Sequence, residues 1–260
     1  MEPIGILYAT PTWVTFVVTA GIGLLAMEAG LRLGRRRADP EPEQGPVDTL
    51  TGGTVGLLAF LLAFAFGIAA ARFDTRSDLV VAEAQATRGT YLYASLLPSP
   101  QRERSQEMLR EYVAIRIEGI KHVEKRRAAI QRSEEIHRQL WDGVQALAAA
   151  DPENGAPSSY SDAVVGLIAA HQERLAKAPG RLPPFVWWSL YLLAVAALMS
   201  LGYQLGLARS RRPVVAPFGV LALAVVVTMI MDLDRGQQGF LTVSQRALED
   251  VLSAISVDKP

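Results

Sequence analysis

Glu134 and His137 form an E-x-x-H step, the spacing with which carboxylate-bridged di-iron bundles place two metal ligands on one helix face. Such a site needs a second E-x-x-H step, and His122 and His171 have no glutamate three residues before them. We therefore expect no metal site and no cofactor. The chain has no cysteine and none of the common phosphate-loop, nucleophile-elbow or zinc-protease motifs, so we predict that it is not an enzyme and has no catalytic residues.

Asp232 and Asp234 are paired carboxylates that directly follow an apolar segment. They could bind a cation, or they could stabilise the local structure through Arg235 and Arg246. Because no third ligand is evident in the sequence, we favour the structural interpretation.

Phe60, Phe64 and Ile68 recur four residues apart, so they lie along one stripe of a helix, and Arg72 and Arg76 follow on the next turns. In an oligomer, a ring of such apolar side chains can constrict a pore by dewetting, and basic side chains at its mouth can attract anions. In the alternative interpretation, the apolar residues pack against other helices. The arginines then pair with Asp74 and Asp78 on the helix surface or anchor lipid headgroups.

Four segments are apolar enough to cross a bilayer, at about residues 12–31, 53–71, 185–207 and 214–231. No proline interrupts the chain between Leu50 and Pro98, which predicts one helix of about 70 Å that leaves the membrane at Arg72 and continues into water. Small residues at the start of the second span would permit close helix packing; they are Gly52, Gly53 and Gly56.

The charged region between the second and third spans predicts an extramembrane bundle of helices. We expect one helix over residues 101–150, a shorter one from residue 158 to just before Pro179, and an amphipathic tail helix at about 242–255 that packs on the bundle. The basic run at 121–132 has no interleaved aromatic residues, so it indicates a solvated face and no nucleic-acid partner. The expected division is 1–71 (spans one and two), 72–180 (extramembrane helices), 181–232 (spans three and four) and 233–260 (tail).

The flanks of the spans carry the usual signals of a membrane boundary. Glu28 precedes Arg32 by four residues, which predicts an ion pair on the helix surface. Prolines in the linker at 35–46 argue against helix there. Aromatic residues at two span ends predict anchors at the interface; they are Trp13, Trp187, Trp188 and Tyr191.

Two short loops carry most of the boundary arginines, at 35–37 and 209–212. The positive-inside rule makes these loops cytoplasmic and places the central helices outside. No basic residue precedes the first apolar segment, so we expect it to be retained as an anchor rather than cleaved as a signal peptide. We therefore expect a multi-pass protein of the cell membrane, in bacteria the inner membrane.

The residues around the end of the second span resemble the signature of the bestrophin-like family of bacterial and plant membrane proteins, long grouped as DUF4239. The chain departs from the family pattern at Gln85 and Gly236, where asparagine and proline are usual. The matching residues are Arg72, Phe73, Arg76, Val81, Glu83, Ala84, Ala86, Tyr91, Leu92, Leu96, Leu97 and Pro98, then Tyr112, Val113 and Arg116, and in the tail Asp232, Asp234 and Gly239.

This resemblance implies a channel. Bestrophins are pentameric anion channels whose second membrane helix supplies a neck of apolar residues spaced four apart, as Phe60, Phe64 and Ile68 are here. They also place their soluble helices in the cytoplasm, opposite to the orientation that the arginine count favours, and the sequence leaves that conflict open.

Two hypotheses follow for an all-α polytopic membrane protein with a helical bundle inserted between spans two and three. The first is a homo-oligomeric anion channel in the lipid bilayer, constricted by Phe60, Phe64 and Ile68, with Arg72 and Arg76 at the pore mouth. The second is a non-conducting sensor or scaffold whose helical domain binds a partner, because about a hundred residues of helix exceed what a minimal pore needs.

Overall fold

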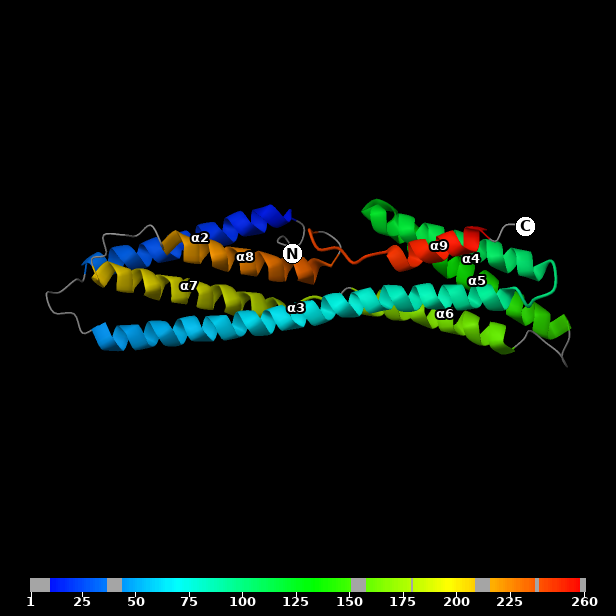
Figure 1. Cartoon of the computed structure of the whole chain (residues 1–260), viewed down its shortest axis with the longest axis horizontal. Helices are drawn as coiled ribbons and strands as arrows, with labels where there is room; N and C mark the ends of the chain where they lie inside the picture. The colour runs from blue at the N-terminus through cyan, green and yellow to red at the C-terminus, as the bar shows by residue number, and fades with distance from the viewer. Residues whose placement is uncertain are drawn as a thin grey trace. The chain divides into compact units, whose positions relative to one another are not determined.

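Every regular element in the described part of the chain is a helix, which confirms the all-α fold (Figure 1). The computed structural model describes residues 10–36, 44–150, 158–178, 180–208, 216–236 and 239–257. In chain order the helices are α2 (Thr12–Arg36), α3 (Gln44–Ala94), α4 (Gln101–Lys121), the 3-10 turn η1 (Val123–Lys125), α5 (Arg126–Ala150), α6 (Ser158–Lys177), α7 (Pro184–Leu207), α8 (Ala216–Arg235) and α9 (Arg246–Val257).

The chain divides into two compact units. Unit 1 comprises Met1–Asp74 and Gly180–Thr242, and unit 2 comprises Thr75–Pro179 and Val243–Pro260. Helix α3 contributes its first part to unit 1 and its last part to unit 2.

Unit 1 contains the apolar spans. Four helices of the described chain, α2, α3, α7 and α8, are long and apolar enough to cross a membrane, as the sequence predicted. Helix α3 runs unbroken to Ala94, which confirms the single helix expected after Leu50. Helix α8 continues to Arg235, four residues beyond the expected end at 231.

Glycines bring α2 and α7 into close contact. A Cβ atom added at Gly30 would lie 2.0 Å from the carbonyl oxygen of Met199, and one added at Gly202 would lie 2.1 Å from a carbonyl oxygen of α2. Only a residue without a side chain permits this approach of two backbones. Gly34 and Gly206 repeat the arrangement one turn further along each helix.

The glycines at the start of the second span do not have this role within the chain. A Cβ atom added at Gly52, Gly53 or Gly56 would meet nothing within 4 Å. The expectation of close packing there is therefore wrong for the single chain, because α3 turns these glycines away from the other helices.

The aromatic residues at the start of α7 face different ways. Trp187 is 1% exposed in the core of unit 1, so its predicted role as an interfacial anchor is wrong, whereas Trp188 is 59% exposed. Successive helical residues point about 100° apart, so two adjacent tryptophans cannot share one surface. The hydroxyl group of Tyr191 lies 2.9 Å from that of Thr19 on α2, and Trp13 is exposed near the start of α2.

Helix α2 ends later, and helix α3 begins earlier, than the sequence predicted. Arg32 Nε donates to Glu28 Oε1 at 2.7 Å, which confirms the predicted pair. Helix α2 extends to Arg36, and α3 already begins at Gln44 with Pro46 in its first turn. Proline is tolerated there because the first N–H groups of a helix have no intrahelical acceptor, so the prediction that the whole 35–46 linker is non-helical is wrong at both ends.

Unit 2 is built from helical hairpins rather than from one long central helix. The expected helix over 101–150 is interrupted at His122, whose backbone is extended (φ −124°, ψ 104°), and η1 turns the chain into α5. Close packing follows at once, because a Cβ atom added at Gly119 would lie 2.5 Å from the Cβ atom of Ala129. No proline marks this turn in the sequence.

The tail helix α9 packs against α4 inside unit 2. It begins at Arg246, four residues later than expected, and buries Leu248, Val251 and Ile255. At its end, Arg110 Nε of α4 donates to the carbonyl oxygen of Ile255 at 2.9 Å. A cation at the carboxyl end of a helix satisfies its last carbonyl groups and interacts favourably with the helix dipole.

Candidate functional site

Two of the three predicted constriction residues lie on an uncovered face of α3. Phe60 is 68% exposed and Phe64 is 56% exposed. Ile68 is only half-buried and packs against the core of unit 1. Residues four apart advance by about 40° around a helix, so the stripe winds from the open face toward the packed face within two turns.

The opposite face of α3 packs against α7 and α8. Leu58 contacts Ala194 and Ala197 of α7, and Ala65 and Ala69 belong to the core that includes Trp187. Only 17% of the most apolar window of α3 is buried, compared with 39 to 44% in the other three spans. The second span is therefore the least covered of the four in the single chain.

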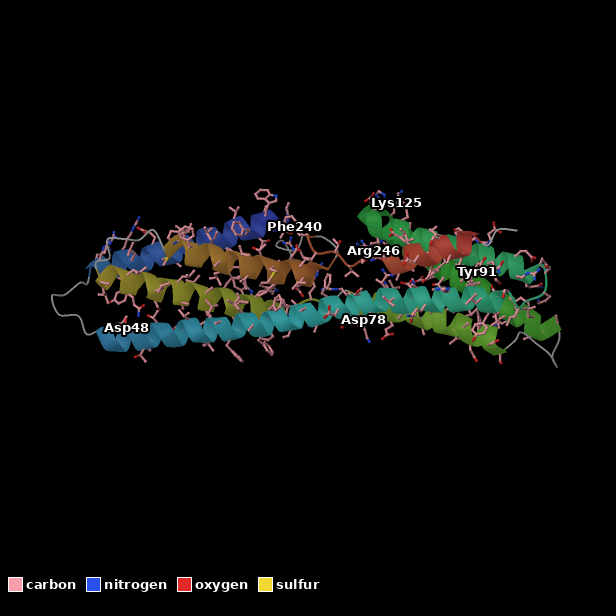
Figure 2. The ribbon with its side chains drawn as sticks, viewed as in Figure 1. Asp48, Asp78, Tyr91, Lys125, Phe240 and Arg246 are labelled. Carbon is pink, nitrogen blue, oxygen red and sulfur yellow. The ribbon has the colours of Figure 1, made fainter. Side chains whose placement is uncertain are left out.

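The charged residues after the span are distributed differently from the prediction. Arg72 is half-buried, and its Nη1 atom is buried without a hydrogen-bond partner among the described residues. Arg76 is buried, at 8% exposure. Asp74 and Asp78 are exposed, the latter visible on α3 in Figure 2, and neither makes an ion pair or hydrogen bond within the described part of the chain.

The expected surface pairing of the two arginines with these two acids is therefore absent from the described residues. Asp74 lies about four turns beyond Phe60 and so points to nearly the same side of the helix, whereas Arg72 points about 120° away. The open face of α3 thus continues from aromatic to acidic side chains.

Unit 2 contains a second group of residues, which we call the buried charge cluster: Glu83, Tyr112, Arg116, His137, His171 and Arg174. Glu83 of α3 is completely buried. Arg116 of α4 donates to it through Nε at 2.8 Å and through Nη2 at 3.3 Å. Arg174 of α6 donates to the other oxygen of Glu83 through Nη1. Its Nη2 atom donates to the side-chain oxygen of Gln245 at 3.1 Å.

The aromatic members of the cluster surround the same carboxylate. The hydroxyl group of Tyr112 donates to Glu83 Oε1, and His171 Nδ1 lies 3.0 Å from that hydroxyl oxygen and 3.3 Å from Oε1. Burial, followed by the charge of Glu83, raises the pKa of Tyr112 well above its ordinary value. Tyr112 therefore remains a hydrogen-bond donor at physiological pH.

His137 of α5 completes the cluster from the remaining side. Its ring lies 5.1 Å from that of Tyr112 and 4.8 Å from that of His171, measured between centroids. Burial, and then the neighbouring His171, lower the pKa of His137 to about 4, although Glu83 acts in the opposite direction. His137 is consequently neutral at physiological pH.

The cluster brings together side chains from α3, α4, α5 and α6. Glu83 comes from α3, Tyr112 and Arg116 from α4, His137 from α5, and His171 with Arg174 from α6, while Gln245 ties in the segment before α9. Two guanidinium groups face one carboxylate. This arrangement can hold helices in register and respond to added charge, because a buried ion pair tolerates no unbalanced partner.

Sequence reasoning did not assemble this cluster. It named Glu83, Tyr112 and Arg116 only as family signature residues and assigned them no chemistry. A useful signal was present, because Glu83 is an acid within an apolar stretch of helix. The two residues of the E-x-x-H step lie in different surroundings, because Glu134 is exposed while His137 is buried; among the described residues, no group of three or more potential metal ligands is found.

Asp232 has a structural role, as the sequence favoured, but its partners among the described residues are not the predicted Arg235 and Arg246. Its carboxylate accepts hydrogen bonds from the hydroxyl group of Thr12 at 3.0 Å and from the backbone N–H groups of Phe240 and Leu241 at 3.1 and 2.7 Å. Gly239 is needed beside it, since an added Cβ atom would lie 1.8 Å from Asp232 Oδ1. The carboxylate thus fastens the turn after α8 to the start of α2.

Asp234 and Arg235 extend this network in unit 1. Asp234 accepts from the backbone N–H of Leu182 at 3.0 Å, just before α7. Arg235 donates to the carbonyl oxygen of Thr10 at 2.8 Å and to the hydroxyl group of Thr15 at 3.0 Å. The last residues of α8 therefore hold the ends of three apolar helices together.

Four apolar helices with polar, well-paired ends define a multi-pass membrane protein. A family model, the Bestrophin-like domain, matches residues 14–248, from the first turn of α2 to the first turn of α9. The chain belongs to the bestrophin-like family, as its signature residues indicated. Neither a search of curated proteins nor a search of solved structures finds a match.

Proposed function

We propose that this protein assembles from several copies of its own chain into an ion channel whose pore is lined by α3. The observation that carries the proposal is the uncovered face of α3, with Phe60 and Phe64 exposed in the single chain. An apolar face on the least covered span is available for a central axis, and a ring of phenylalanines there would gate by dewetting. The bacterial inner membrane is the proposed location.

Anion conduction is the first candidate, because bestrophins conduct anions and because aromatic rings carry positive edges that can face an anion. In this reading Phe60 and Phe64 form the neck with Ile68, and Arg72 provides positive charge beside it. Arg76 is buried in the single chain, so it reaches the pore mouth only if its side chain turns outward in the assembly.

Cation conduction is the second candidate, favoured by one specific observation. Asp74 and Asp78 are exposed, are unpaired within the described residues and continue the face that carries Phe60 and Phe64. In a symmetric assembly each would form a ring of carboxylates, and such rings favour cations.

The test is a planar-bilayer recording of purified protein across a potassium chloride gradient. A reversal potential near that of chloride supports the first candidate, and one near that of potassium supports the second. The double variant Phe60→Ala with Phe64→Ala should conduct more readily than wild type, because smaller side chains let water fill the neck. The matched control is Leu192→Ala, an exposed apolar residue of α7 (74% exposed), which should leave the conductance unchanged.

Silence of both the wild type and the double variant would refute a channel of either selectivity. The non-conducting sensor or scaffold would then be the better description, especially if the mass in detergent corresponded to a monomer or dimer. A closed ring of copies together with conductance would support the channel.

A further inference from the structure

The imidazole rings of His137 and His171 form a buried pair with unused hydrogen-bonding atoms. They are 5% and 1% exposed, and their ring planes meet at 82°. The Nε2 atom of each ring is buried and has no hydrogen-bond partner among the described residues. A buried polar atom without a partner costs free energy, so two such atoms side by side need an explanation.

We propose that the His137–His171 pair is a proton-binding site whose occupation loosens the buried charge cluster of unit 2. Every named group is in unit 2, and the proton site is independent of whether the protein conducts ions.

Among the groups that face His137, Glu83 is the one anion that could balance an added proton. From α3 it faces Glu83, from α4 Tyr112 and Arg116, and from α6 His171. Glu83 already accepts hydrogen bonds from both arginines and the tyrosine. The charged residues of η1 lie about three turns away along α5 and do not enter the cluster.

A proton on His137 would therefore add a third positive charge to two buried guanidinium groups that share one carboxylate. Like charges in a buried site raise the free energy of the packed form, whereas water solvates the imidazolium once the helices separate. Proton binding thus favours the loosened form.

The hydrogen-bond partners of His171 determine which of its ring nitrogens carries the N–H group. Its Nδ1 atom lies within hydrogen-bond distance of the Tyr112 hydroxyl oxygen and of Glu83, and both can accept its N–H. With its N–H on Nδ1, the ring has Nε2 as its other nitrogen, and that atom has no partner among the described residues. The two rings therefore place two unpartnered Nε2 atoms in a buried space where Glu83 is the one anion that faces them.

The direction of the pH effect follows from the difference between the pKa of His137 in the packed form and its pKa in the loosened form. Burial, together with the neighbouring His171, lowers the pKa of His137 from its ordinary 6.5 to about 4 in the packed form. Between these two values the loosened form binds more protons than the packed form, so acid favours loosening. Between pH 7.5 and pH 5.0 the opening constant should rise about 25-fold.

Hydrogen exchange of the full-length protein in detergent tests the proposal, with rates corrected for the intrinsic effect of pH. Backbone amides at 133–140 of α5 and 167–174 of α6 should show the 25-fold increase in opening at pH 5.0. His137→Gln keeps a polar side chain but cannot titrate, and it should remove most of the response. His122→Gln is the matched control, because His122 is half-exposed outside the cluster and the response should persist.

A wild-type response below about threefold, or a full response retained in His137→Gln, would overturn the proposal. Should His137→Gln fail to fold, carbon-13 NMR titration of the wild-type histidines decides instead. The resonance that remains after His122→Gln and His171→Asn identify the other two should have a midpoint near 4. A midpoint near 6.5 would overturn the proton site.

Discussion

Glu83→Gln is the sharpest test of the buried charge cluster as the structural centre of unit 2. The change preserves the shape of the side chain but removes the charge that balances Arg116 and Arg174. It also turns an amide donor toward groups that are themselves donors. Removing one partner of a buried ion pair typically costs about 3–5 kcal/mol, because the other charges remain buried without compensation.

The size of unit 2 converts this free energy into a melting shift. Unfolding entropy of about 2.1 cal/mol/K per residue over about 120 residues makes each kcal/mol worth about 4 °C, so we expect a decrease of about 12–20 °C. Circular dichroism of the full-length protein in detergent measures the transition, and peptide-resolved hydrogen exchange assigns it to unit 2.

The matched control is Glu111→Gln. Glu111 accepts from Arg132 at 2.7 Å, but both side chains are more than a third exposed, so we expect a loss of only about 0–1 kcal/mol. A Glu83→Gln protein that melted within about 4 °C of wild type, or no lower than Glu111→Gln, would refute the reasoning that the cluster holds the helices of unit 2 together.

Three further changes test the packing of each unit separately. Gly30→Val should lower the melting temperature of the purified protein by separating α2 from α7, whereas Gly21→Val on the same helix should have little effect, because an added Cβ there meets nothing within 4 Å. Trp187→Ala should cost about 3–5 kcal/mol through lost packing in the core of unit 1, which thermal unfolding measures; an equal loss in Gly21→Val would argue against both expectations. Arg110→Met removes the donor to the carbonyl oxygen of Ile255, so the amides of α9 should exchange about tenfold faster, and unchanged exchange would show that the hydrophobic face of α9 is sufficient (Figure 2 shows Tyr91, the second acceptor of this arginine).

The spans were predictable because their signal is local. A run of about 20 apolar residues identifies a membrane helix without reference to the rest of the chain, and absence of proline identifies α3 as one continuous helix. Errors arose where a local signal was weak. The turn at His122 has no proline to mark it. Trp187 and Trp188 are adjacent and of the same residue type, yet the first is buried and the second is exposed.

The candidate sites were predictable only in part. The spacing of Phe60 and Phe64 predicted one face of α3, and both side chains are exposed in the single chain, while their role as a constriction stays a prediction. Periodicity alone could not tell that Arg76 is buried while Asp74 is exposed, because that depends on which side of α3 faces its neighbours.

By itself, the sequence determined that this is an all-helical protein with four apolar spans and a long continuous α3, because hydrophobicity and helix propensity act between near neighbours. Only the tertiary structure decided that Glu83, Arg116, His137 and Arg174 share one buried site. These residues come from four different helices, α3 to α6, and no local sequence pattern links them. Their charges become chemically linked only when packing excludes water, because in water each would be solvated separately.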